Sequence, residues 1–423
     1  MKDLVKKVAV GLSTGALVAQ SMILPAFAEI TIVVNGNGSN SDPNVNVAST
    51  NTTTVNQTNT ANVKNDIDAK ANTGDNSADD NTGGDINIDT GEAKALVEVS
   101  NKLNSNEAQV DCGGCPADVN VEVSGNGTYS QPDVNLALTN TTWVTQDNTA
   151  NVENDVEVKA NSGDNDADDN TGGNTSIDTG KATAWAGVEN TLNANVAHVG
   201  GSGEGALEIL VNGNGSYSDP NVTLALAGTT GLVQNNFADV ENDVEVKANS
   251  GKNDADDNTG GNNSIDTGDA WAGAQVDTLA NFNLAHVEDC CEFDGLVKVA
   301  GNGTDSEPDV TLALVNTLYA TQDNNFTCGE EKGWEHLFWG DWRSNDCDVE
   351  AKANSGKNDL DDNTGDPGSD PSIDTGKAST EVEVNNEANS NVFSTGDAFP
   401  DHPEWDMGSE SNWFWWFLSG HSN

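Results

Sequence analysis

The chain has 423 residues and carries 69 acidic against 17 basic side chains, for a formal net charge of −52. A surface this acidic repels phosphate backbones, so nucleic acid and anionic membranes are excluded as natural partners. Arg343 is the only arginine, which argues against enzymes that clamp phosphates or carboxylates with several arginines.

The first 28 residues have the pattern of a secretory signal peptide. Three lysines precede an apolar stretch from Val8 to Leu24, and Ala26-Phe27-Ala28 supplies a small-x-small cleavage pattern. The mature chain should therefore begin at Glu29, and we expect it to be secreted and associated with the cell surface. No later apolar run approaches the roughly 20 residues of a membrane-spanning helix, so no membrane insertion is expected after signal removal.

The rest of the chain is a tandem repeat. The landmark Gly-Asn-Gly begins at residues 36, 125, 213 and 301, at spacings of 89, 88 and 88. A second landmark, Ile-Asp-Thr-Gly, begins at residues 88, 177, 265 and 373, where the last spacing is 108. The fourth copy has therefore gained 20 residues, mostly between Cys328 and Cys347. These landmarks predict repeats at 29–117, 118–205, 206–293 and 294–396, followed by an aromatic tail at 397–423.

Within a repeat, apolar and polar residues alternate with a period of two, which predicts β-strands. In the second repeat, the even positions from Val134 to Ala160 and from Ala182 to Val196 form one face of small apolar residues and Asn. A narrow β-solenoid favours small inward residues and lets Asn or Gln stack in hydrogen-bonded ladders. We therefore predict an all-β solenoid or elongated stack, with four tandem Ig-like sandwiches as the alternative. The 88-residue period further suggests several solenoid rungs per repeat.

The segment from Asn161 to Asn174, followed by Ile177-Asp-Thr-Gly180, resembles the Asn/Thr/Gly-rich repeat proteins exported by candidate-phyla-radiation bacteria. The inward Asn and Gln are also similar in style to curli-type repeats, although the short curli period is missing. The resemblance implies a cell-surface or filament role and offers no active site to transfer.

An acidic turn recurs in each repeat, with the sequence Asp-Asp-Asn-Thr-Gly. Carboxylates and Asn carbonyls are the hard oxygen ligands that calcium prefers, so calcium is the expected cofactor. The alternative is an Asx-rich turn exposed to solvent. The candidate ligands are Asp79, Asp80, Asn81, Asp168, Asp169, Asn170, Asp256, Asp257, Asn258, Asp361, Asp362 and Asn363.

Six cysteines fit an oxidising destination. A disulfide between Cys328 and Cys347 is predicted to close the insertion of the fourth repeat. The pairing of the other four, at positions 112, 115, 290 and 291, stays open.

Aromatic side chains concentrate in the insertion and in the tail, where they could contact a partner or cap the last repeat. The candidate contact residues are Trp334, Phe338, Trp339, Trp342, Trp413, Trp415 and Trp416. The sequence thus favours a structural or adhesive surface protein without enzymatic activity, stabilised by calcium and able to bind copies of itself. The alternatives are a glycan-binding module on a repeat stalk and a polysaccharide-active β-helix enzyme.

Overall fold

The computed structural model describes residues 4–14, 18–19, 30–110, 118–200, 204–288, 292–329, 347–365, 368 and 370–395. Within these ranges the chain is all-β, as predicted, and its strands run from β1 to β19. The described ranges contain no helix long and apolar enough to cross a membrane.

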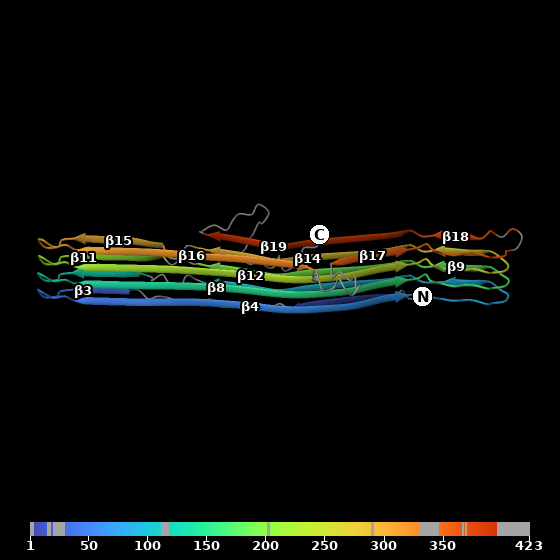
Figure 1. Cartoon of the computed structure of the whole chain (residues 1–423), viewed down its shortest axis with the longest axis horizontal. Coiled ribbons are helices and arrows are strands. Elements are labelled where there is room, and N and C mark those ends of the chain that lie inside the picture. Colours follow the sequence, from blue (N-terminus) through green and yellow to red (C-terminus); the bar gives the residue numbers. More distant parts are fainter. Residues whose placement is uncertain are drawn as a thin grey trace, which may run out of the picture.

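Each repeat forms one complete coil. In the first coil, β3 (Ile30–Asn35) leads through the Gly-Asn-Gly turn into the long strand β4 (Asn44–Asn72). The chain then reverses at the acidic turn and returns through β5 (Ile86–Asp89) and β6 (Ala93–Val110) (Figure 1). The second and third coils repeat this course with β7 (Asp118–Ser124), β8 (Asp133–Asn161), β9 (Thr175–Thr179), β10 (Ala182–Val199), β11 (Glu204–Asn212), β12 (Asn221–Asn249), β13 (Asn263–Thr267) and β14 (Ala270–Val287).

The fourth coil has the same course with one interruption. Its strands are β15 (Glu292–Ala300), β16 (Asp309–Cys328), β17 (Asp348–Asn354), β18 (Ser372–Thr375) and β19 (Ala378–Thr395). Two further strands precede the first coil, β1 (Leu4–Thr14) and β2 (Val18–Ala19), and both pair with β6.

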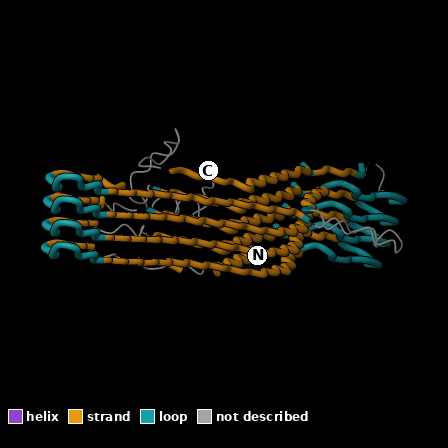
Figure 2. Tube along the Cα trace, turned by 60° about the vertical axis from the view of Figure 1, so that its left-hand side comes forward, coloured by secondary structure: helices purple, strands orange, loops and turns teal. Residues whose placement is uncertain are grey.

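The four coils stack in parallel and in register (Figure 2). Equivalent strands form four sheets, in the orders β1-β6-β10-β14-β19, β15-β11-β7-β3, β16-β12-β8-β4 and β18-β13-β9-β5. The expectation of several rungs per repeat was therefore wrong, because one repeat makes one wide rung. The 29 residues of β4 span roughly 95 Å at about 3.3 Å per residue, so two such lengths and their turns use up the whole repeat.

The core is a thin layer between the long strands and the returning strands of each coil. Around the beginning of β6 it consists of alanine and valine, with Ala95 and Val97 packed near Ala69 and Ala71 of β4. Around β7 it becomes larger, with Val121 against Leu136. Small side chains let the two layers approach closely along most of the coil, which is why this composition suits a solenoid better than a thick sandwich.

Polar ladders run along the stack inside this layer, as the inward Asn and Gln predicted. Gln146 Nε2 donates to Gln57 Oε1 at 2.7 Å, and Gln234 Nε2 donates to Gln146 Oε1 at 2.8 Å. Asn154 Nδ2 likewise donates to Asn242 Oδ1 at 2.7 Å. Because each amide both donates and accepts, a row of identical residues satisfies most of its own buried hydrogen-bonding groups, although the Nδ2 of Asn242 is buried without an acceptor among the described residues.

The predicted disulfide between Cys328 and Cys347 is present, with a Cα–Cα distance of 5.8 Å. It joins the end of β16 to the residue before β17, and both strands pair with the uninterrupted β12. The pairing offset between the third and fourth coils is 88 residues before the insertion, 105 after it and 108 from β18 onward. The disulfide therefore closes a 17-residue insertion, after which β17 pairs with β12 in the same register as β16. Three further inserted residues lie between β17 and β18.

Candidate functional site

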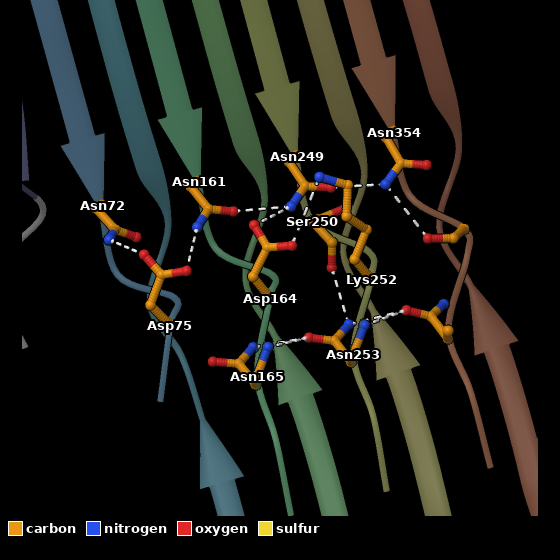
Figure 3. Close-up of polar contacts among 12 residues, drawn as sticks. Asn72, Asp75, Asn161, Asp164, Asn165, Asn249, Ser250, Lys252, Asn253 and Asn354 are labelled. Atoms are coloured by element: carbon orange, nitrogen blue, oxygen red, sulfur yellow. Dashed lines mark hydrogen bonds and ion pairs between the residues drawn. The ribbon is translucent and has the colours of Figure 1, made fainter. Parts of the chain in front are cut away.

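The acidic turns lie side by side along one edge of the stack, where the long strands end and the chain reverses. An Asn ladder marks the entrance to the turns: Asn249 Nδ2 donates to Asn161 Oδ1 at 2.9 Å, and Asn354 Nδ2 donates to Asn249 Oδ1 at 2.7 Å (Figure 3). A second ladder follows within the turns, where Asn165 Nδ2 donates to Asn253 Oδ1 at 2.8 Å. These ladders place the acidic residues of successive coils directly above one another.

The first Asp of each predicted triplet forms a carboxylate ladder. The backbone N–H of Asp168 donates to Asp79 Oδ1 at 3.1 Å, and that of Asp256 donates to Asp168 Oδ1 at 2.8 Å. The N–H of Asp361 continues the row to Asp256 Oδ1. One oxygen of each of these three accepting carboxylates is thus fixed by the next coil, and the four like charges are held in one row.

The Asp two positions earlier joins this row. Burial, followed by a hydrogen bond to Asp168 and the charges of its neighbours, raises the pKa of Asp166 to about 6. Burial and the nearby charges of Asp168 and Asp256 raise the pKa of Asp254 to about 7. The Oδ1 atoms of Asp166 and Asp254 are buried without a hydrogen-bond donor. Such atoms are poorly solvated, and a bound cation would supply the missing positive charge.

The other predicted ligands lie differently. Asn170 and Asn258 are buried, and their Oδ1 atoms accept the backbone N–H of Asn81 and Asn170 at 2.9 and 3.0 Å. Their amide oxygens are therefore engaged inside the stack. The second Asp of each triplet has a positive φ and sits at the exposed tip of the turn, at Asp80, Asp169, Asp257 and Asp362.

The oxygens that converge come from an Asp-x-Asp pattern, whose first member is not among the ligands predicted from the sequence. That pattern reads Asp166-x-Asp168, Asp254-x-Asp256 and Asp359-x-Asp361, with Ser77 in the first coil. Ser77 Oγ donates to Asp79 Oδ2 at 2.5 Å. Alternation within an extended segment puts residues two apart on one side, and this signal could have identified the pair.

A second group of potential ligands lies at the ends of β10 and β14. The rings of His198 and His286 stack with centroids 5.2 Å apart, and their Nε2 atoms lie 3.6 and 3.7 Å from Glu288 Oε1. Burial, followed by the neighbouring His198, lowers the pKa of His286. Two imidazoles and a carboxylate are a ligand set that zinc accepts. The equivalent positions in the first and fourth coils are Gln109 and Ser394, so the histidine pair belongs to the second and third coils alone.

A polar hollow of about 320 Å³ lies on the outer face of the long strands, beside the start of the insertion. Lys64, Glu153, Glu241 and Gly329 are among the residues that line it. The predicted aromatic contact residues of the insertion and of the tail lie outside the described residues, as do the cysteines at 112, 115, 290 and 291.

The fold defines the chain as a tandem-repeat, parallel β-solenoid with one coil per repeat. No protein-family model matches the chain, and comparisons with curated proteins and with solved structures give no significant match.

Proposed function

We propose that the protein is an exported structural component of the cell surface, a rigid β-solenoid stabilised by calcium at its acidic turns. The observation that carries this proposal is the row of stacked carboxylates, in which Asp166 and Asp254 each hold a buried oxygen without a donor. A stack of like charges opposes compaction unless a cation lies between them.

The ligands that we assign differ in part from the predicted triplets. Asp168 and Asp256 are kept, and Asp166 and Asp254 replace the Asn residues whose oxygens are engaged in the ladder. Calcium accepts six to eight oxygen ligands in flexible geometry, which suits carboxylates supplied by several coils together with water. Extracellular modules bind calcium at about 10⁻⁴–10⁻³ M, a range suited to a secreted protein.

The test is thermal unfolding followed by circular dichroism, in calcium, in chelator, in magnesium and in sodium at matched ionic strength. Calcium should raise the melting temperature, since a ligand that binds only the folded state stabilises it by mass action. Magnesium should be less effective, because it demands octahedral geometry and gives up water reluctantly. Equal stabilisation by sodium would mean that the carboxylates need only screening and would contradict the proposal.

A matched pair of variants localises the effect. Asp166→Asn with Asp254→Asn removes two carboxylates from the row, whereas Glu153→Gln with Glu241→Gln removes two from the outer face. Only the first pair should abolish the calcium-dependent part of the stabilisation. If both pairs retain it, calcium binds elsewhere.

A second candidate function, glycan binding, is favoured by the polar hollow beside the insertion. Carboxylates and amides lining an exposed hollow can hydrogen-bond sugar hydroxyls. Binding on a glycan array that disappears when Lys64 and Glu153 are replaced by alanine, in a protein that still folds, would support this role.

A further inference from the structure

The stack has two ends, one at the first coil and one at the fourth, and each end exposes the edges of its strands. Among the described residues, the fourth coil ends all four sheets on one side, with β15, β16, β17, β18 and β19. On the other side, β3, β4 and β5 end three sheets, and the fourth ends with β1 beside β6. Backbone groups on such edges are ready to pair with a further strand. Inside the chain, each coil pairs through one edge with the preceding coil and through the other edge with the following coil. The two exposed ends present one edge of each kind.

The edge of the fourth coil is also apolar. Leu312 is 39 % exposed, whereas its equivalent Leu224 in the third coil is fully buried. Val384 is 47 % exposed, and its equivalent Val276 is 1 % exposed. Most of the exposed large apolar side chains in the described ranges belong to this coil: Leu296, Val297, Val299, Leu312, Leu314, Val315, Leu318, Tyr319, Ile373, Val382, Val384 and Phe393.

Glycines in the turns show how tightly the coils approach. A β-carbon at Gly163 would lie 2.0 Å from the carbonyl oxygen of Gly251, and one at Gly251 would lie 2.1 Å from that of Gly356. At the Gly-Asn-Gly turn, a β-carbon at Gly127 would lie 2.5 Å from the backbone nitrogen of Ser39 in the preceding coil. Stacked coils therefore require glycine at these positions.

The same positions in the outermost coils are also glycine, although no described residue requires it there. A β-carbon at Gly356 would have no atom of the described residues within 4 Å, and neither would one at Gly38. Neither residue has the positive φ that favours glycine. In the direction of the stack, Gly356 faces the position of a fifth coil, and Gly38 faces the position of a coil before the first.

We propose that a second copy of this chain supplies those coils, so that the fourth coil of one copy pairs in register with the first coil of the next. Gly356 would then approach the carbonyl oxygen of Gly74, and Gly38 would approach the backbone of Thr304, as their equivalents do inside the chain. The contact joins two different surfaces and does not close on itself, so it generates a filament. This assembly deepens the structural role proposed above, but it does not require calcium at the turns.

β1 occupies the position on the first coil where a strand of the second copy would pair. β1 pairs with β6 from Leu4 opposite Ala93 to Thr14 opposite Leu103. By the repeat register, Ala378 of a second copy would lie opposite Ala93, so β1 holds the place that β19 would take. This edge therefore accepts a parallel strand, and removal of residues 1–28 opens it for assembly.

The experiment uses the processed chain (residues 29–423) with Gly38→Ala, Gly356→Ala and, as a control, Gly295→Ala. A β-carbon at Gly295 would meet only Leu207 Cδ2, at an ordinary 3.9 Å. Light scattering and negative-stain electron microscopy should show wild-type and Gly295→Ala filaments. Gly38→Ala and Gly356→Ala should fold with unchanged melting temperature but need at least about tenfold more protein to assemble.

A mixture of the Gly38→Ala and Gly356→Ala variants distinguishes the two ends of the stack. Gly38→Ala keeps a native fourth coil, and Gly356→Ala keeps a native first coil. Below the concentration at which either variant assembles alone, an equimolar mixture should therefore form one-to-one dimers and nothing longer. A wild type that stays monomeric at every concentration would overturn the proposal, as would filaments that both variants form as readily as wild type. Melting of the monomeric Gly38→Ala variant with and without calcium tests the proposed calcium site separately.

Discussion

The internal Asn ladders should contribute strongly to stability, and Asn148 is the best position to measure this. Its side chain is 2 % exposed and lies in the second coil, with ladder neighbours on both sides. Its Nδ2 lies within hydrogen-bond distance of three oxygens, which share its two N–H groups: Ala194 O (3.1 Å), Asn195 Oδ1 (2.9 Å) and Asn236 Oδ1 (3.1 Å). Its Oδ1 accepts from Asn59 Nδ2 (3.1 Å) and Asn106 Nδ2 (2.9 Å).

Asn148→Ala removes all five contacts at once. Each buried hydrogen bond contributes about 1 kcal/mol net, and a buried group left without a partner costs about 1–3 kcal/mol. Since the remaining amides can partly pair with one another, we expect a loss of about 3–5 kcal/mol in the free energy of unfolding. The assay is urea denaturation followed by circular dichroism, with the slope checked against wild type.

The matched control is Asn151→Ala, three residues further along the same strand. Asn151 is exposed on the outer face, and its Nδ2 donates to Asn62 Oδ1 at 2.7 Å. Because water can replace that partner, the expected loss is below about 0.5 kcal/mol. Equal losses for the two variants would refute the view that the inward ladders, rather than Asn rows in general, stabilise the fold.

Three other predictions can be tested on the same protein. The pKa values of Asp166 and Asp254 are raised to about 6 and about 7, so in chelator the folded state binds more protons than the unfolded state from about pH 4 to pH 7. The melting temperature should fall as pH rises through that window, and a flat profile would contradict the shifts. Replacing Cys328 and Cys347 together by serine should cost about 3 kcal/mol and speed amide exchange at the end of β16; unchanged exchange there would show that the bond is dispensable for register. Gly163→Ala should cost about 3 kcal/mol, measured by the same urea titration, whereas Gly295→Ala should be neutral; a tolerated Gly163→Ala would contradict the close approach of the coils.

The sequence predicted the inward face of the long strand correctly. Every even position from Val134 to Ala160 is buried, as the period of two indicated. On the returning strand the predicted positions are buried up to Ala194. Asn193 adopts a φ of 58°, which shifts the alternation by one residue, so that Ala197 and Val199 are buried while Val196 is only partly buried.

The sequence predicted calcium ligands in the acidic turns, and calcium binding there stays a prediction. The first Asp of each predicted triplet lies in the carboxylate row. The amide of Asn170 was assigned to a metal, whereas it is buried in the ladder. Whether an Asx side chain points into the stack or to solvent depends on the turn backbone, and residue type alone does not reveal it.

The sequence by itself determined the repeat, the β-strands, the inward amides and the disulfide, because each is encoded by local periodicity or by spacing along the chain. Only the tertiary structure decided that one repeat makes one coil, since that depends on whether 29-residue strands fold back or continue to the next repeat. It also brought Asp166 beside Asp254, and His198 beside His286, across 88 residues. Such neighbours are set by the register between coils, which the summed pairing of four sheets fixes together.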